Sequence, residues 1–362
     1  MKELQTHKAL HSLSRNDLDG CIDFLRSSIE WNGLARSAIH DLLAGILYLE
    51  SVGMRQRPTL FCERMNQGYI SFLGYCPNCS FGSVTDRWCP NETTKKGIIG
   101  KGKNKPESNQ IGAICSDVTL RLLRTVLADD VKIATIGGQH EVDAIIKRTG
   151  IVSLWEIKSS PFFLPAFIND STSTAHHQLQ THDMSTISIT IPGNMSVFLI
   201  PESVGLGTQQ RDLSQLNSAE WVRFASDFVR TWSAAYHQYR NRFPPDSNSY
   251  QLLVCSGSAK TDDSKNHPGI NRTDDIKKGT YQALKFTGKY KRYCRKDTVY
   301  GGIISNVRPL NIRLEEYIND ILDINIESDS GNNRRLCDAI LSLDDPFGEC
   351  LYDPGLRVLR RS

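Results

Sequence analysis

The fold is decided by the stretch GGQHEVDAIIKRTGIVSLWEIK, which occupies residues 137–158. Its two apolar runs predict neighbouring β-strands joined by the turn Lys147–Gly150. Glu156 and Lys158 are two residues apart, so their side chains leave the second strand on the same face. Asp143 lies on the preceding strand, where the hairpin brings it toward the same point. Three charged side chains therefore converge within an apolar strand pair.

Such a placement needs a chemical reason, because an unpaired charge in an apolar strand costs several kcal/mol. Two carboxylates from adjacent strands can hold Mg²⁺, with waters and a phosphate oxygen completing the octahedron. A lysine beside them can orient or deprotonate an attacking water and offset charge that develops on a phosphate. The competing interpretation is a structural Glu–Lys ion pair on a half-exposed hairpin.

The order Asp, then Glu-x-Lys, resembles the PD-(D/E)xK nuclease superfamily over about residues 131–160. The matching residues are Asp143, Glu156, Ile157 and Lys158, with valine in place of the usual proline before the aspartate. The resemblance implies an α/β fold with a mixed central sheet flanked by helices, a restriction-endonuclease-like core. It implies Asp143, Glu156 and Lys158 as catalytic residues and Asp143, Glu156 and Ile157 at a magnesium ion. It favours a type II restriction endonuclease, which would cut double-stranded DNA to leave 5′-phosphate and 3′-hydroxyl ends.

Other polar residues are candidates for the same site. Glu107 and Asp117 lie in or beside the helix expected from Ser108, where the superfamily often carries a further acidic residue. The sequence does not choose between them. His177 and Gln178 follow the Glu-x-Lys strand and are candidates to line the cleft, although a solvated polar face is the favoured explanation of this segment.

A second metal site is predicted from the cysteines. Cys76 and Cys79 enclose Pro-Asn and are soon followed by glycine, a tight turn that looks like a zinc knuckle. Cys62 and Cys89 are the nearest candidates for the remaining two ligands. A closed Cys₄ site has no open position, so its zinc would be structural. A redox Cys-x-x-Cys and unliganded buried thiols are the alternatives.

The densest basic segment follows residue 269 and is expected to form a helix with interleaved tyrosines. Its first turns combine lysines, a glycine and a hydroxyl, which suit a phosphate at a helix N-terminus. The expected DNA-binding residues are Lys277, Lys278, Thr280, Gln282 and Lys285. The segment loosely resembles parts of type II restriction endonucleases, and a solvated helix face is the alternative.

Periodicity predicts the remaining elements. Helices are expected as a pair within residues 15–50, from Ser108, over 218–240 and over 313–322; strands are expected over 131–136, 186–191, 196–200 and 298–306. The aromatic row of the 218–240 helix is expected to be a core face. The predicted domains are a helical N-terminal module (1–55), a Cys₄ module with a basic linker (56–105), a nuclease core with its DNA-binding helix (106–325) and a peripheral tail (326–362).

Composition sets the remaining expectations. The chain has 362 residues, a net charge of +3 and ten cysteines, so basic residues act through local clusters rather than a global field. No stretch predicts a membrane span or a signal peptide, which indicates a cytoplasmic protein without disulfides. Double-stranded DNA is the expected partner, and palindromic sites would imply a homodimer. A repair, recombination or transposon-end nuclease of the same core and a non-catalytic, zinc-containing nucleic-acid-binding protein remain as alternatives.

Overall fold

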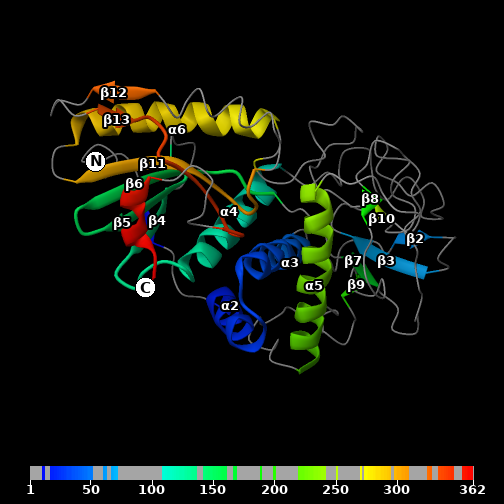
Figure 1. Ribbon diagram of the computed structural model, residues 1–362. Helices are drawn as coiled ribbons and strands as arrows, with labels where there is room; N and C mark the ends of the chain where they lie inside the picture. The colour runs from blue at the N-terminus through cyan, green and yellow to red at the C-terminus, as the bar shows by residue number, and fades with distance from the viewer. Residues whose placement is uncertain are drawn as a thin grey trace. The chain divides into compact units, whose positions relative to one another are not determined.

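The computed structural model divides the chain into two compact units. Unit 1 comprises Met1–Arg15, Ser116–Ser159 and Gly269–Ser362, and unit 2 comprises Asn16–Cys115 and Ser160–Pro268. The residues that the structure describes are 10–12, 17–51, 60–62, 67–71, 108–136, 142–160, 166–168, 188–189, 199–200, 219–241, 250–251, 270, 273–294, 297–309, 324–327, 333–345 and 353–361. Figure 1 shows the elements of both units.

Unit 1 is built on a six-stranded mixed sheet with the strand order β1-β4-β5-β6-β11-β14. Its strands are β1 (Leu10–Ser12), β4 (Lys132–Ile136), β5 (Ala144–Arg148), β6 (Ile151–Ile157), β11 (Thr298–Ser305) and β14 (Ala339–Ser342). Pairing is antiparallel from β1 to β6, whereas β11 runs parallel to both β6 and β14. A separate antiparallel pair joins β12 (Asn325–Glu327) to β13 (Asn333–Arg335). The predicted mixed α/β class is confirmed.

The predicted hairpin of β5 and β6 is present, with a shorter turn than expected. Lys147 and Arg148 remain in β5, where they pair with Val152 and Ile151. Only Thr149 and Gly150 form the turn, and Gly150 has a φ of 77°. A two-residue hairpin loop needs positive φ, which glycine adopts without strain. The prediction of a four-residue turn over residues 147–150 was therefore wrong.

Helix α6 (Thr273–Tyr293) covers one face of this sheet (Figure 1). Its buried residues Ile276, Ala283 and Phe286 join one apolar cluster with Leu154 of β6 and further residues of β5 and β11. The helix approaches β11 so closely that a Cβ on Gly301 would lie 1.8 Å from Thr287 Cγ2. No side chain larger than hydrogen fits at that position of β11 unless the Thr287 side chain moves.

Helix α4 (Ser108–Arg124) contacts the opposite face. It begins in unit 2 and continues into unit 1, because the boundary between the units falls after Cys115. In unit 1 the Thr119 hydroxyl donates a 2.8 Å hydrogen bond to Ser159 Oγ. Strand alternation places Ser159 on the same side as Trp155, away from α6. Trp155 is fully buried and donates to Ser153 Oγ, so both faces of β6 are covered.

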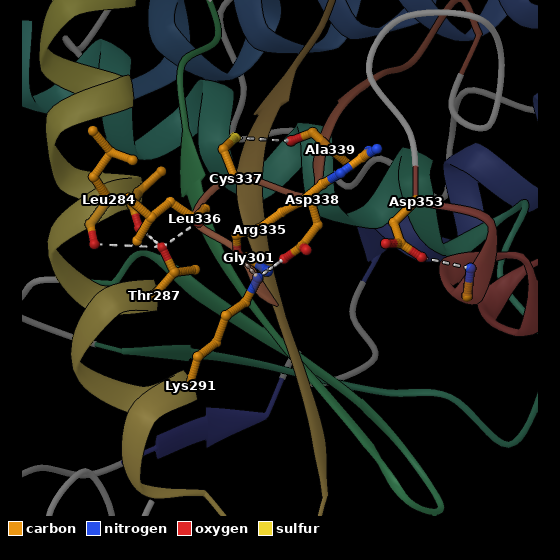
Figure 2. A network of polar contacts seen from close by, with 12 residues as sticks. Leu284, Thr287, Lys291, Gly301, Arg335, Leu336, Cys337, Asp338, Ala339 and Asp353 are labelled. Atoms are coloured by element: carbon orange, nitrogen blue, oxygen red, sulfur yellow. Dashed lines mark hydrogen bonds and ion pairs between the residues drawn. The ribbon is translucent and has the colours of Figure 1, made fainter. Parts of the chain in front are cut away.

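A buried polar network fastens α6 to the far half of the sheet. Lys291 reaches the Asp338 carboxylate, and its ammonium also donates to the Arg335 carbonyl (Figure 2). The same carboxylate accepts a 2.7 Å hydrogen bond from Gly301 N. One turn earlier on the helix, Thr287 Oγ1 donates to backbone carbonyls of its own helix and of the segment before Asp338. Burial lowers the pKa of Lys291 and raises that of Asp338, while their mutual attraction opposes both shifts.

The C-terminal segment is an integral part of unit 1. Strand β14 pairs with β11, and Ala339 and Leu341 are buried. Beyond it, a 3₁₀ helix at Pro354–Leu359 begins with Asp353, whose carboxylate accepts from Gly355 N. The expected peripheral tail over residues 326–362 was therefore wrong, because its strand completes the central sheet. The helix expected over 313–322 lies outside the described residues.

Unit 2 contains the predicted N-terminal helices, α2 (Asp17–Ser28) and α3 (Gly33–Ser51), together with α5 (Ala219–Asn241). The aromatic row of α5 is a core face as expected, since Phe228, Trp232 and Tyr236 are buried. Trp232 Nε1 donates a 2.7 Å hydrogen bond to Asp41, which also lies 2.9 Å from His40 Nδ1. These contacts join α5 to α3 through fully buried polar groups.

The short strands of unit 2 form two small sheets. One has the order β2-β3-β7-β9, from β2 (Leu60–Cys62), β3 (Gln67–Ser71), β7 (Ala166–Ile168) and β9 (Leu199–Ile200). The other pairs β8 (Ser188–Ile189) with β10 (Tyr250–Gln251). The strands expected over 186–191 and 196–200 are thus not extensions of the central sheet. The expected single domain over 106–325 is likewise interrupted, because residues 160–268 belong with residues 16–115. Among the described helices, none is long and apolar enough to cross a membrane.

The network in Figure 2 predicts an unequal response to substitution of two basic residues. Lys291→Met leaves the buried Asp338 without its cation, which should cost about 3 kcal/mol of unfolding free energy. Arg361→Met removes an ion pair to Asp129, whose side chain is 86 % exposed, and should cost less than about 0.5 kcal/mol. Urea-induced unfolding measures both. Equal losses would show that the buried pair does not hold α6 in place.

Candidate active site

Asp143 and Glu156 lie opposite each other on one face of the hairpin. Ala144 pairs with Trp155, and Asp143 and Glu156 are the next residues along the two strands. Asp143 N donates to Trp155 O at 3.0 Å, and Asp143 Oδ2 accepts from Ile157 N at 2.8 Å. The aspartate side chain is therefore fixed by the main chain of β6 at the point where β5 begins. Directly opposed like charges destabilise a strand pair, so this arrangement is not explained by sheet stability.

Lys158 completes the group from the end of β6. Its ammonium forms an ion pair with Glu156 Oε1, and its backbone N–H donates a 2.8 Å hydrogen bond to Ile304 O of β11. The Glu156 side chain is 8 % exposed and that of Lys158 is 21 % exposed. The lysine thus packs against the protein and retains access to solvent. The structure brings together all three residues that the sequence singled out.

Glu156 is held in an environment that favours its protonated form. Its pKa is raised to about 7, first because burial removes water from the carboxylate and second because Asp143 places a like charge beside it. The ion pair with Lys158 acts in the opposite direction without cancelling these effects. With both carboxylates ionised, the group of two acids and one ammonium carries a net charge of −1.

Helix α6 passes close to this group. A Cβ on Gly279 would lie 3.2 Å from Lys158 Cγ and 3.3 Å from Ile303 Cδ1. The alkyl stem of the lysine therefore packs directly under the helix backbone. This contact limits the conformations that the Lys158 side chain can adopt and helps to exclude water from the Glu156 carboxylate. The basic helix and the Glu-x-Lys strand belong to separate stretches of the chain, and the fold joins them in one place.

The structure separates the predicted DNA-binding residues of α6 into two groups. Lys277, Lys278 and Lys285 are exposed, as a phosphate contact requires. Thr280 is only 5 % exposed and lies among the residues that pack on the sheet, so the structure does not present it at the surface. Gln282 is partly buried. Neither Thr280 Oγ1 nor Gln282 Oε1 has a hydrogen-bond partner among the described residues.

The remaining candidates are not joined to the site. Asp117 forms an ion pair with Arg121 one turn along α4, at 3.0 Å, and is not among the groups that shift the Glu156 pKa. Glu107, His177 and Gln178 lie outside the described residues. So do Cys76, Cys79 and Cys89, while Cys62 is described only as part of β2. Across the described ranges, no three His, Cys, Asp or Glu side chains are placed to hold a metal ion, and the Cys₄ zinc site stays a prediction.

The basic segment after residue 269 contains one buried cation. Lys291 belongs to that segment, yet its side chain is 1 % exposed and pairs with Asp338. The helical periodicity of the segment could have predicted that Lys291 is buried. Ile276, Ala283 and Phe286 define the buried arc, and Lys291 falls beside it at about 100° per residue.

The carboxylate pair fits a divalent cation by its charge and chemistry. Hard cations take carboxylate and carbonyl oxygens as ligands, and Asp143 and Glu156 supply two carboxylates from adjacent strands. Their net charge of −1 with Lys158 and the raised pKa of Glu156 both mark a site where a positive charge would be stabilised. Asp143, Glu156 and the neighbouring Ile157 are thus suited to hold magnesium.

The raised pKa predicts how stability depends on pH. Below the ordinary glutamate pKa of 4.5, Glu156 is protonated in both the folded and the unfolded protein, and it contributes no penalty. As pH rises to about 7, the unfolded chain releases this proton while the folded protein keeps it, so stability falls. Above pH 7 the full penalty is present, about 3 kcal/mol.

Glu156→Gln removes this penalty, so its stability relative to wild type should be greater at pH 8 than at pH 5, by about 1–3 kcal/mol. Urea unfolding at the two pH values measures the difference without added metal. Asp129→Asn is the matched control, because the Asp129 side chain is 86 % exposed and its effect should be alike at both values. If the difference between Glu156→Gln and wild type were constant with pH, the assignment would be contradicted.

Comparisons with known proteins add no second line of argument. No protein-family model matches the chain, and neither the curated proteins nor the solved structures contain a match. The chemistry of Asp143, Glu156 and Lys158, and their setting under α6, must therefore carry the functional conclusion.

Proposed function

We propose that the protein is a magnesium-dependent endonuclease that hydrolyses phosphodiester bonds in double-stranded DNA. The observation that carries the proposal is the opposition of Asp143 and Glu156 on one sheet face, with Lys158 paired to Glu156. A buried and a half-buried carboxylate are retained against their own repulsion, and a lysine stands where charge would develop on a phosphate. A purely structural ion pair would need only one of the acids.

The residues have distinct roles in this proposal. Asp143 Oδ2 accepts from the Ile157 N–H, so the carboxylate is held in a constant direction. Glu156 is ionised above about pH 7 and can then accept a proton or a cation. Lys158 offsets negative charge on the phosphate and orients the attacking water through its ammonium. Magnesium held by Asp143, Glu156 and Ile157 would supply Lewis-acid polarisation of the phosphate.

Within this class we infer a type II restriction endonuclease that acts as a homodimer on palindromic sites. The basic helix α6 beside the Glu-x-Lys strand supports DNA as the substrate, because its N-terminal half contacts Lys158. Discrete fragments from a plasmid would support restriction, whereas general degradation or branch-dependent nicking would indicate a repair or recombination nuclease. A structural zinc on Cys62, Cys76, Cys79 and Cys89 remains part of the proposal.

Cleavage of supercoiled plasmid in the presence of Mg²⁺ tests the proposal. Lys158→Ala and Asp143→Ala should each lower the cleavage rate by about 100-fold or more, because Lys158 offsets charge on the reacting phosphate and Asp143 would hold the magnesium. Lys147→Ala is the matched control, since Lys147 is an exposed lysine on the same hairpin, and should retain wild-type cleavage. Wild-type protein that leaves many different plasmids intact with both Mg²⁺ and Mn²⁺ would refute the nuclease function.

Metal binding can be measured separately from cleavage. Millimolar Mg²⁺ or Ca²⁺ should raise the melting temperature of wild type by a few degrees at pH 8, because a ligand that binds only the folded state stabilises it. The gain should shrink at pH 6, where a proton on Glu156 competes with the cation. Asp143→Ala should lose the gain. An equal gain in Asp143→Ala would place the cation elsewhere.

A further inference from the structure

The outer face of α6 carries a continuous set of cations. Lys277, Lys278, Lys285, Lys289 and Arg292 are all exposed. At about 100° per residue these positions fall within roughly one third of the helix circumference. They lie opposite the arc that packs on the sheet, which contains Ala283 and Phe286. We call these five residues, with Tyr281 and Tyr293, the outer face of α6.

The charge of this face has one sign. No Asp or Glu occurs between residues 276 and 293, although exposed helices commonly gain stability from acidic and basic side chains four apart. Asp274 and Asp275 precede this interval in the first turn, where carboxylates suit the helix dipole. Lys291 is buried instead and pairs with Asp338. Like charges along one helix destabilise it slightly, so helix stability does not explain the choice of five outer cations.

The two tyrosines on the same face are unusually accessible. Tyr281 is 64 % exposed and Tyr293 is 66 % exposed, and they are two of the four large hydrophobic residues exposed in the described part of the chain. Tyrosine hydroxyls donate to phosphate oxygens and tyrosine rings stack on bases. Between them, Lys289 Nζ lies 5.4 Å from the centre of the Tyr290 ring. Along the helix, exposed cations lie between the two exposed tyrosines.

The apolar side of α6 is already used. Ile276, Phe286 and Tyr290 are buried in the core of unit 1, so the helix has no aliphatic face to insert into a membrane, as an interfacial helix requires. The seven residues of the outer face offer ammonium, guanidinium and phenol groups. This chemistry fits a phosphate backbone better than a lipid surface.

We infer that the outer face of α6 binds the phosphate backbone of duplex DNA that flanks the cleaved bond. The inference deepens the proposed nuclease function and rests on it for the identity of the substrate. From Lys277 to Tyr293 the helix rises roughly 24 Å, which is the length of about seven base pairs. Because Gly279 contacts Lys158 from the inner side of the helix, the turn of α6 that carries Lys277 and Lys278 lies level with the candidate active site, and the rest of the outer face leads away from it along the helix axis.

The test replaces three cations that lie far along the helix from the contact with Lys158. The variant Lys285→Gln, Lys289→Gln, Arg292→Gln removes three charges from the outer face. Its matched control, Arg124→Gln, Lys132→Gln, Lys147→Gln, removes three charges from exposed positions elsewhere in unit 1. Binding of a fluorescent duplex is measured by anisotropy over a range of NaCl concentrations in EDTA, so that cleavage cannot occur.

The outer-face variant should raise Kd by roughly 10- to 1,000-fold near physiological salt and reduce the slope of log Kd against log salt by about two to three. The control should change Kd by less than about 3-fold, and the arginine replacements Lys285→Arg and Lys289→Arg should retain binding, since they keep the charge. Melting temperatures verify that all variants are folded. Equal Kd values and salt slopes for the outer-face variant and its control would overturn the inference.

Cleavage assays and vesicle binding separate this inference from the proposed function. If wild type cuts plasmid but the outer-face variant binds DNA normally, only the surface assignment fails. If wild type binds DNA through α6 but never cuts it, the surface stands and the nuclease function fails. Wild type that binds phosphatidylserine vesicles and not duplex DNA would overturn the choice of DNA as the occupant of this face.

Discussion

The close approach of α6 to the sheet governs both the fold of unit 1 and the environment of its candidate site. Two glycines permit it: Gly301 lets the helix lie on β11, and Gly279 lets it lie on the stem of Lys158. The face that α6 covers is the one from which Glu156 and Lys158 project. The same packing that buries the apolar cluster therefore removes water from Glu156 and raises its pKa. The contact between α6 and the sheet therefore both stabilises unit 1 and raises the pKa of Glu156.

Two charged groups lie under this helix, and they differ in their charge balance. Lys291 and Asp338 form a neutral pair, to which Gly301 N and Arg335 O add backbone hydrogen bonds. The group of Asp143, Glu156 and Lys158 contains two carboxylates and one ammonium, and thus an excess of one negative charge. Burial of a satisfied pair is explicable by structure alone, whereas the second group is balanced only when a proton or a cation joins it. This contrast separates a structural network from a candidate active site.

The sequence predicted local features of both units better than the strand pairing that assembles the central sheet. Side-chain alternation predicted that Glu156 and Lys158 share a face, and the period of α5 predicted the buried Trp232. The tail was mispredicted because β14 has only four residues, and its place beside β11 follows from long-range pairing that local patterns do not encode. The burial of Lys291 does not follow from the basic composition of its segment, because position around the helix decides which side chains are buried. Three of the four predicted zinc ligands, and the cleft candidates His177 and Gln178, fall outside the described ranges.

The fold places different requirements on the inner arc and on the outer face of α6. The inner arc must be apolar to pack on the sheet, and one flank must carry Thr287 and Lys291 to reach the segment before β14. Neither requirement reaches the outer face, where polar residues of either charge would keep the helix soluble. If the fold alone determined these residues, the outer face would carry both acidic and basic side chains. Beyond the first turn, however, every charged residue of that face is a cation. The side of the helix that faces away from the sheet is the side whose residues best report a partner.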